Sequence, residues 1–529
     1  MADKFDLVVI GAGPGGYEAA IEGVQKGMKV ALVENRELGG TCLNRGCIPT
    51  KTLVHAAEVL EEIRSCEKLG IHVGQVSYNF AGMHERKAEV VEQLRGGIEG
   101  LFKAYKIDLI RGCGIILDSN RIQVGDQAYE TDRILIATGS KPAMPPIPGL
   151  TLPGVVTSDE MLEGKGVYCK KLVIIGGGVI GVEFATIYHA LGCEVTIIEA
   201  LDRILPTLDR EVSQNLTMIL KKRGIKVYTG ARVDRVEHTD QSVQTAQEKG
   251  LAVYFMSKEK EQCVETERVL VSIGRRANTE GICPPSLNLQ MQRGMIPVDD
   301  SFETCIKGIY AIGDIVLGGI QLAHVASAQA VNAVCSMFGE RAPMNLSCIP
   351  SCIYTNPEIA AVGMTADEAK MRGIRTITGK AIMSSNGKTV IEMADRGFVK
   401  LVFEEESKVL LGAVLMCSRA TDMITGLSDG VAGKLTMSQL AATVRPHPTF
   451  SEAIGEAIED ADGGAIHAAP RRKWRRKIKW DIRVILRLHR KQRQDQSTRL
   501  QAHWGFRKNI LKITDHTRLK LTTAITTMH

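Results

Sequence analysis

Two cysteines, Cys42 and Cys47, are the residues of this chain whose type and spacing most directly suggest chemistry, and they lie in the stretch GGTCLNRGCIPTK, residues 39–51. The chain has 13 cysteines among 529 residues, an odd number scattered along the sequence. That usage is not typical of the disulfide framework of a small secreted domain, so we expect a reducing, cytoplasmic setting. Disulfides there are usually catalytic or redox-sensing. The pair is therefore predicted to be redox-active, with two buried structural thiols as the alternative.

The segment after Cys47 is predicted to form a helix. Leu53, Ala57 and Leu60 recur at helical spacing in IPTKTLVHAAEVLEEI, and Pro49 suits a first helical turn. Cys47 would then lie at or near a helix N-terminus, where the dipole lowers the pKa of a thiol. The thiolate is the form that attacks a disulfide, so the position favours reactivity.

A glycine turn of the form G-x-G-x-x-G occurs twice, each time after an apolar strand and before a helical segment. The residues are Gly11, Gly13, Gly16 and Glu34 in the first unit, and Gly176, Gly178, Gly181 and Glu199 in the second. The glycines allow a pyrophosphate to approach the backbone, and the acid can bind ribose hydroxyls. Two such units predict two dinucleotide cofactors that exchange electrons.

The acid of the second unit predicts which nicotinamide dinucleotide is bound. A carboxylate at Glu199 would accept a hydrogen bond from an adenosine 2′-hydroxyl and repel a 2′-phosphate, which favours NAD over NADP. Arg203 lies nearby in the sequence and weakens this argument.

Length and hydropathy predict several soluble domains. A chain of 529 residues is too long for one hydrophobic core, and about three domains are expected. The apolar run at the N-terminus is too short for the core of a signal peptide, and no stretch is long enough to span a bilayer.

Five further motifs follow in order: ILIATGSKP at 134–142, LVSIGRRANTEG at 270–281, IYAIGDI at 309–315, LAHVA at 322–326 and RPHPTFSEA at 445–453. With the cysteine pair and both glycine turns, they make the chain resemble the flavoprotein disulfide reductase family, and within it most closely the dihydrolipoamide dehydrogenases. The resemblance runs from about residue 4 to residue 472.

The resemblance implies an α/β fold with two doubly wound Rossmann-like dinucleotide-binding domains and a C-terminal α+β dimerisation domain. The expected segments are an FAD-binding domain at 1–145, an NAD-binding domain at 146–276, a segment at 277–342 that returns to the FAD domain, a dimer-interface domain at 343–470 and a tail at 471–529.

The resemblance also implies two sets of cofactor-binding residues. Those for FAD are Gly11, Gly13, Gly16, Glu34, Lys51, Thr138, Gly139, Gly313, Asp314, Leu322 and Ala323, with Asp314 reaching the ribityl chain. Those for NAD are Gly176, Gly178, Gly181, Glu183, Glu199 and Gly274. No metal site is expected, because the other close cysteine pair, Cys348 and Cys352, lacks companions at metal-ligand spacing.

By the same resemblance, Cys42 and Cys47 form a redox-active disulfide. Cys42 looks like the thiol that exchanges with the substrate, and Cys47 looks like the thiol that faces the flavin. Lys51 and Glu183 resemble an ion pair beside the flavin and the nicotinamide.

His447 in HPTFSE is the candidate general base, and Glu452 is expected to orient its ring. In the family this histidine reaches the disulfide of the partner subunit, which implies a homodimer. The sequence departs from the common family pattern at Arg445, where many members have histidine, and at Thr50, where serine is commoner. Arg445 leaves the substrate preference less certain.

The implied reaction is oxidation of dihydrolipoyl groups on proteins of 2-oxoacid dehydrogenase or glycine cleavage systems, with reduction of NAD⁺. A glutathione-type or mercuric reductase is the alternative within the family. GCIPTK and Glu199 argue against the first, and the lack of a cysteine pair near the C-terminus argues against the second.

The tail at 471–529 differs in composition from the rest of the chain. It holds 18 of the 66 Lys and Arg, only 3 of the 60 Asp and Glu, and all 3 Trp residues. Trp474, Ile478, Ile482 and Ile485 recur at helical spacing among arginines. The tail is predicted to bind nucleic acid or an anionic membrane, or to be an unselected and disordered extension.

Overall fold

The computed structural model describes residues 4–242, 249–394 and 396–468. Residues up to 466 belong to one compact unit, and of the segment 467–529 only the first two residues are described. The interpretation of the basic tail at 471–529 falls outside the described residues and stays a prediction.

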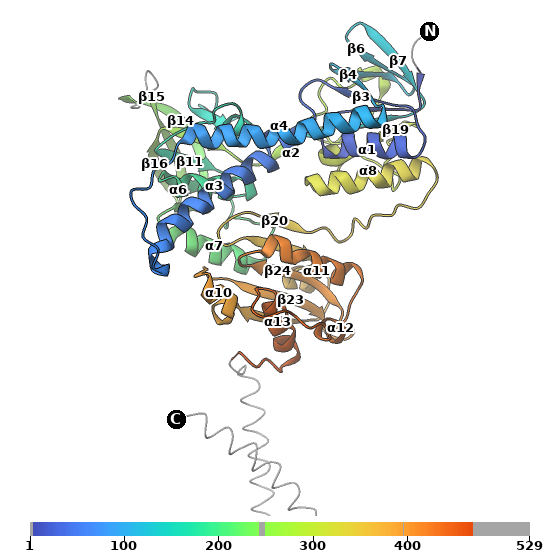
Figure 1. The fold of residues 1–529 in the computed structure, drawn as a ribbon. Coiled ribbons are helices and arrows are strands. Elements are labelled where there is room, and N and C mark those ends of the chain that lie inside the picture. The colour runs from blue at the N-terminus through green and yellow to red at the C-terminus, as the bar shows by residue number, and fades with distance from the viewer. Residues whose placement is uncertain (1–3, 243–248, 395, 469–529) are drawn as a thin grey trace, which may run out of the picture. The chain divides into compact units, whose positions relative to one another are not determined.

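This unit begins with a five-stranded parallel sheet whose strand order is β19-β8-β2-β3-β4. The strands are β2 (Leu7–Ile10), β3 (Val30–Glu34), β4 (Asp108–Arg111), β8 (Ile134–Ile136) and β19 (Ile309–Ala311). Helices α1 (Pro14–Gln25) and α8 (Ala323–Met337) pack against each other beside it (Figure 1). Every residue of β2 and β3 is buried, as expected for parallel strands covered on both faces. Since β19 lies far along the chain and pairs with β8, the sheet is completed by a returning segment.

A second parallel sheet repeats this design, with the order β10-β17-β11-β12-β13. Its strands are β10 (Val155–Thr157), β11 (Lys171–Ile175), β12 (Glu194–Ile198), β13 (Lys226–Tyr228) and β17 (Arg268–Val271). Its helices are α5 (Ser158–Leu162), α6 (Val179–Ala190) and α7 (Arg210–Lys222). An antiparallel sheet of β14 (Ala231–Ser242), β15 (Lys249–Ser257) and β16 (Lys260–Thr266) shares an apolar core with it.

Between β3 and β4 the chain forms the helices that carry the cysteines. They are α2 (Gly40–Arg45), α3 (Cys47–Ser65), the 3-10 turn η1 (Cys66–Leu69) and α4 (Phe80–Tyr105). A small sheet of β1 (Lys4–Phe5), β5 (Gly114–Asp118), β6 (Arg121–Val124) and β7 (Gln127–Thr131) follows. Strand β9 (Ser140–Pro142) follows β8, where the chain leaves the first sheet, and β18 (Arg275–Ala277) follows β17, where the chain returns toward it. The two strands pair antiparallel.

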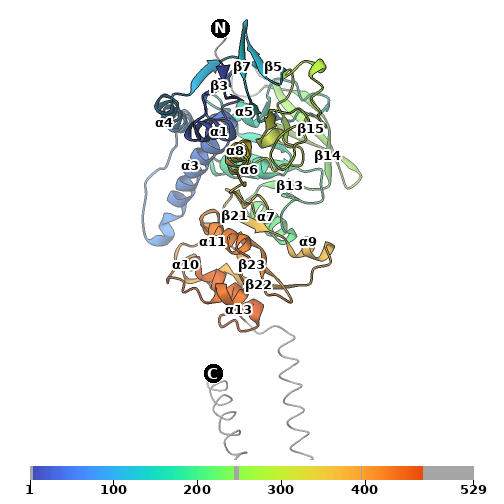
Figure 2. The same ribbon diagram turned by 90° about the vertical axis from the view of Figure 1, so that its right-hand side faces the viewer.

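The C-terminal part, orange in Figure 2, is an antiparallel sheet of order β20-β21-β24-β23-β22 with helices packed on it. The strands are β20 (Ser351–Ile353), β21 (Ile359–Gly363), β22 (Thr376–Ile382), β23 (Phe398–Glu404) and β24 (Leu410–Met416). The helices are α9 (Ala366–Met371), α10 (Gly387–Ile391), α11 (Ala420–Ala432), α12 (Met437–Ala441) and α13 (Glu452–Asp462), and the short 3-10 turns of the chain are η2 (Pro285–Leu287), η3 (Gly313–Ile315) and η4 (Met383–Ser385). The predicted fold class, two parallel α/β domains and an α+β domain, is confirmed. The exact domain boundaries stay predictions.

Within the described ranges, no helix has the length and apolar character needed to cross a bilayer.

Candidate active site

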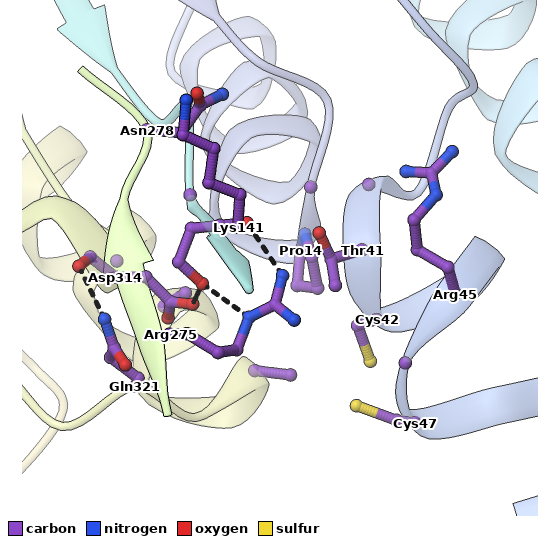
Figure 3. A pocket seen from close by; sticks show the side chains of 18 of the residues that line it. Pro14, Thr41, Cys42, Arg45, Cys47, Lys141, Arg275, Asn278, Asp314 and Gln321 are labelled. Atoms are coloured by element: carbon purple, nitrogen blue, oxygen red, sulfur yellow. Dashed lines mark hydrogen bonds between the residues drawn. The ribbon is translucent and has the colours of Figure 1, made fainter. Parts of the chain in front are cut away.

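A cavity of about 430 Å³ lies where β2, β3, β8 and β19 end. The carboxyl ends of parallel strands are where α/β folds usually bind ligands. The predicted FAD residues that line it are Gly11, Gly13, Glu34, Lys51, Thr138, Gly139, Gly313, Asp314 and Ala323, whereas Gly16 and Leu322 do not. Cys42, Cys47 and Glu183 line the same cavity, so it joins the first glycine turn to the cysteine pair and to α6 (Figure 3).

The first glycine turn is packed tightly against the protein at Gly11 and Gly16 and is open at Gly13. Gly11 has a φ of +105°, and a Cβ there would lie 2.4 Å from the Ala137 carbonyl oxygen. A Cβ at Gly16 would lie 1.8 Å from the Gly11 carbonyl oxygen. In contrast, a Cβ at Gly13, the N-cap of α1, would meet no atom of the described residues within 4 Å. This open side suits a pyrophosphate at the helix N-terminus.

A second observation fits a ligand in this cavity. The hydroxyl of Thr138 is buried and has no hydrogen-bond partner in the described part of the chain. Buried hydroxyls are normally paired, so a bound group with a matching polar atom would satisfy it. These residues therefore fit the FAD that the resemblance implies.

The second glycine turn repeats this geometry. Gly176 has a φ of +110° and its Cβ would lie 2.5 Å from the Ser272 carbonyl oxygen. A Cβ at Gly181 would lie 2.1 Å from the Gly176 oxygen, and one at Gly178, the N-cap of α6, would meet nothing within 4 Å among the described residues. Gly274, which follows β17, has a φ of +120°. The turn suits a second dinucleotide.

The acids Glu34 and Glu199 have a structural role that the sequence did not predict. Glu34 accepts backbone N–H bonds from Ala12 and Arg36, both at 2.7 Å. Glu199 accepts them from Gly177 at 2.6 Å and Leu201 at 2.7 Å. Each buried carboxylate thus fixes the glycine turn of its own unit. Because a carboxylate has further acceptor positions, the predicted ribose contact stays compatible with these bonds.

The Arg203 side chain is directed to the protein. It donates to the Pro206 carbonyl oxygen at 2.8 Å and lies 3.7 Å from the Asp202 carboxylate. An arginine near Glu199 could bind the 2′-phosphate of NADP. Since Arg203 already contacts Pro206 and Asp202, it argues less strongly against the predicted preference for NAD than its place in the sequence does.

Two alanine substitutions should separate the cofactor sites. Gly13 and Gly178 both have extended backbone with negative φ, which alanine adopts without strain. We expect Gly13→Ala to lower FAD affinity at least tenfold, and Gly178→Ala to raise the KM for NAD⁺ while FAD stays bound, because each methyl group would occupy the side open to phosphate. FAD titration of apoprotein and NAD⁺ kinetics measure the two effects. Unchanged FAD binding by Gly13→Ala would contradict the FAD assignment.

Cys42 and Cys47 come together through a tight turn between α2 and α3. Gly46 forms this turn, and a Cβ there would lie 2.8 Å from the Thr41 carbonyl oxygen. Cys47 is the first residue of α3, so the predicted helix start is confirmed. Figure 3 shows the two sulfur atoms facing each other in the wall of the cavity.

The pKa values of the two thiols are shifted in opposite directions. A hydrogen bond from Cys42, together with the Lys51 ammonium, lowers the pKa of Cys47 to about 7 although burial opposes the shift. The same hydrogen bond and burial raise the pKa of Cys42 above its ordinary value. All 13 cysteines are described, and all are free thiols. Cys42 and Cys47 are thus present here as the reduced pair. The redox-active Cys42–Cys47 disulfide of the oxidised form stays a prediction.

Lys51 and Glu183 form an ion pair between α3 and α6, with Nζ–Oε distances of 2.8 and 3.0 Å. The buried Glu183 carboxylate also accepts the Tyr354 backbone N–H at 2.9 Å. The Lys51 ammonium lies 4.6 Å from the centroid of the Tyr354 ring. Tyr354 follows β20, and no sequence motif pointed to it. These contacts hold the ammonium beside Cys47 at the cavity wall.

His447 and Glu452 are in contact, with 2.8 Å between Nδ1 and Oε1. The other oxygen of Glu452 accepts the Thr449 backbone N–H at 2.8 Å, which fixes the carboxylate. The His447 side chain is 79% exposed, and it is not among the described residues that line the cavity of its own chain. Because Nδ1 faces the acid, Nε2 is the nitrogen available for proton transfer.

Further cavity residues hold Asp314. Ser140 donates its hydroxyl to the Asp314 carboxylate at 2.5 Å, and Arg275 donates to the Ser140 hydroxyl at 2.8 Å (Figure 3). Gln321 donates to the Asp314 carbonyl oxygen at 3.3 Å. Ser140 and Arg275 lie in two of the motifs that carried the resemblance, so those motifs were the signal that could have revealed them.

No group of three or more His, Cys, Asp or Glu side chains in the described ranges is arranged to hold a metal ion. The expectation of no metal site stays a prediction.

The chain belongs to the pyridine nucleotide-disulphide oxidoreductase family, which it matches over residues 5–330, with a match to the family's dimerisation domain over residues 349–458. It is 41% identical to the dihydrolipoyl dehydrogenase of Bacillus subtilis (strain 168), a similarity that covers 88% of this chain and 100% of that protein. It is 39% identical to the dihydrolipoyl dehydrogenase of Chlamydia pneumoniae, with 89% and 100% covered. The predicted family is confirmed.

Solved structures are similar as well. The HOCl-induced flavoprotein disulfide reductase RclA from Escherichia coli superposes with a TM-score of 0.76 at 28% identity, covering 86% of this chain and 99% of that chain. The crystal structure of LpdA from Mycobacterium tuberculosis gives a TM-score of 0.77 at 27% identity, with the same coverage, 86% and 99%.

Proposed function

We propose that the protein is a dihydrolipoyl dehydrogenase, which oxidises dihydrolipoyl groups to lipoyl groups and reduces NAD⁺ to NADH with the help of FAD. One observation carries this proposal: the thiols of Cys42 and Cys47 lie together in the wall of the cavity that the first glycine turn forms. The first turn of α6, which starts at the second glycine turn, lies in the same wall. The arrangement brings a dithiol, the first dinucleotide-binding turn and the start of the helix that follows the second turn to one cavity.

The protein residues perform a dithiol–disulfide exchange. A thiolate of the substrate attacks Cys42 Sγ in the oxidised Cys42–Cys47 pair, which forms a mixed disulfide and releases Cys47 as a thiolate. The second substrate thiolate then attacks the substrate sulfur of the mixed disulfide, which forms the lipoyl disulfide and releases Cys42. A thiol of low pKa leaves readily, and the helix start, the Cys42 hydrogen bond and Lys51 all favour the Cys47 thiolate. When bound, FAD held by the cavity residues and NAD⁺ held at the second glycine turn would accept the two electrons released as the thiol pair returns to its disulfide, so that NAD⁺ becomes NADH.

His447 is the group that accepts the substrate thiol proton, at Nε2, while Glu452 stabilises the resulting imidazolium through Nδ1. The exposure of His447, and its position outside the cavity of its own chain, support a role at the Cys42 of a partner subunit. The functional unit is then a homodimer formed through the dimerisation domain.

NAD rather than NADP is the expected nicotinamide cofactor, because Glu199 places a buried carboxylate at the end of β12, where a 2′-phosphate would be repelled. The partners are lipoyl-bearing proteins of 2-oxoacid dehydrogenase or glycine cleavage systems. The odd number of cysteines, 13, scattered along the sequence supports a reducing compartment, the cytoplasm.

A steady-state comparison tests this function. Purified, FAD-loaded protein should oxidise dihydrolipoamide with NAD⁺ much faster than with NADP⁺, and it should reduce glutathione disulfide poorly with NADPH. A higher kcat/KM for glutathione disulfide and NADPH would instead favour the glutathione-type alternative. Reduction of Hg²⁺ is the matching assay for the mercuric alternative.

A further inference from the structure

Arg45 lies between the two reactive cysteines in the sequence, yet its guanidinium points away from both sulfur atoms (Figure 3). Only 6% of the residue is exposed. Its Nη2 donates to the Glu37 carboxylate, and its Nε donates to the Glu163 carboxylate at 3.1 Å. Arg36 donates to the same Glu163 oxygen at 2.8 Å. The last residue of α2 is thus tied to the segment after β3 and to the segment after α5.

The segment around Glu163 is itself held from inside the protein. Lys87 of α4 is only 4% exposed and donates to the carbonyl oxygens of Leu162 and Gly164, the latter at 3.0 Å. Burial lowers the pKa of Lys87, and the Glu163 carboxylate opposes that shift. A buried ammonium is costly unless it is hydrogen-bonded. Moving either carbonyl group away from Lys87 would therefore cost free energy, which restrains the backbone at Leu162 and Gly164. They flank Glu163 directly.

Packing adds to this restraint. Lys87 lies 3.2 Å from Nδ1 of His84, and a Cβ at Gly166 would lie 2.0 Å from the His84 ring. The chain from residue 162 to residue 166 is therefore fixed on α4. The backbone that carries Glu163 is thus held on both sides, although 46% of the Glu163 side chain is exposed.

Helix α2 needs such restraints, because an isolated helix of six residues is not stable. On one side Asn44 holds it, donating to the carbonyl oxygens of Leu38 at 2.8 Å and Gly40 at 2.9 Å and accepting from Arg95 at 2.9 Å. On the other side Arg45 provides the contacts. The position of α2 sets where the Cys42 sulfur lies relative to Cys47.

We propose that Arg45 is a positioning residue for the redox pair: anchored on Glu37 and on the Lys87-held Glu163, it fixes α2 so that the Cys42 sulfur keeps facing the Cys47 sulfur (Figure 3). The redox role of Cys42 and Cys47 in this inference rests on the proposed function. The effect of Arg45 on the reactivity of the two thiols can be measured without turnover. The Cys42 hydrogen bond is the largest contribution that lowers the pKa of Cys47. Loosening α2 therefore raises that pKa and slows the release of Cys47 during exchange.

The test compares Arg45→Met with wild type in FAD-loaded, reduced enzyme. Alkylation by iodoacetamide is followed across pH, with each cysteine resolved by peptide mass. We expect the midpoint for Cys47 to rise by about one pH unit, which lowers its thiolate fraction at neutral pH roughly tenfold. In turnover, kcat should fall while the KM for dihydrolipoamide changes little. Arg45→Lys keeps the positive charge but cannot donate to Glu37 and Glu163 in the planar geometry of a guanidinium. The Cys47 midpoint in this variant should therefore lie between those of wild type and Arg45→Met.

The matched control is Arg86→Met, which removes an arginine of α4 from an exposed pair with Glu89 at 3.0 Å. It should leave the alkylation profile unchanged. If Arg45→Met does not retain FAD, Glu163→Gln is the deciding variant, since it keeps Arg45 and Glu37 and should shift the midpoint in the same direction by a smaller amount. A profile like that of Arg86→Met in the deciding variant overturns the proposal. Absence of dihydrolipoamide turnover in wild type would refute the proposed function alone, because the alkylation profile does not depend on that substrate.

Discussion

Cys42→Ser is expected to lower the rate of dihydrolipoamide oxidation by roughly 10³-fold or more, because a serine hydroxyl cannot form the mixed disulfide on which exchange depends. FAD should remain bound, since Cys42 is one residue among many in the cavity wall. The serine hydroxyl can still donate a hydrogen bond to Cys47. Cys47 should therefore keep its low pKa and remain open to alkylation near pH 7.

Cys47→Ser is expected to act differently on the remaining thiol. The pKa of Cys42 is raised mainly by the hydrogen bond to Cys47 and by burial. Removing the Cys47 thiolate removes the first of these causes, so the pKa of Cys42 should fall and its alkylation should begin at lower pH than in wild type. Turnover should be lost in this variant too, because no disulfide can form.

Peptide mass analysis after timed alkylation measures both variants, and Cys66→Ser is the matched control at the other end of α3. The control should leave turnover and both alkylation profiles unchanged. If Cys42 became less reactive in Cys47→Ser, the assignment of thiol and thiolate would have to be reversed.

The parts of the site that could be predicted from the sequence are those set by local spacing. The first glycine turn follows an apolar strand and opens a helix, and the φ of +105° at Gly11 is what such a turn requires. Cys47 could likewise be placed at a helix start from the apolar period that follows it. The Lys51–Glu183 contact was expected only from the family resemblance, because nothing local relates residues 132 positions apart.

The remaining contacts depend on tertiary packing, which a single sequence does not reveal. The six-residue helix α2 has no apolar period to indicate it, and Arg45 finds Glu163 only because α5 is brought to the same place. The backbone role of Glu34 and Glu199 also escaped prediction, since an acid at a strand end suggests a ribose ligand and not its own turn. Tyr354 is similar: its N–H matters only because β20 ends beside Glu183.

His447→Ala is expected to keep FAD and NAD⁺ binding and to lower the turnover of dihydrolipoamide by roughly 10² to 10⁴-fold, the usual cost of losing a general base. His55 provides the matched control, because it is an equally exposed histidine, with 80% of its side chain accessible, on α3. His55→Ala should turn over at the wild-type rate. Equal losses in both variants would point to a nonspecific effect and contradict the assignment of the base.

A mixed dimer of one Cys42→Ser chain and one His447→Ala chain then decides which subunit provides the base. If His447 serves the Cys42 of the partner subunit, one site of this dimer carries both substitutions and the other carries neither, so about half of the wild-type rate should return. If His447 served its own chain, each site would carry one substitution and the mixture would stay inactive. Separately tagged chains, mixed under conditions that exchange subunits and purified on both tags, provide the heterodimer for the assay. Recovery of activity would also show that a monomer cannot complete the reaction, because its exposed histidine would have no cysteine pair to serve.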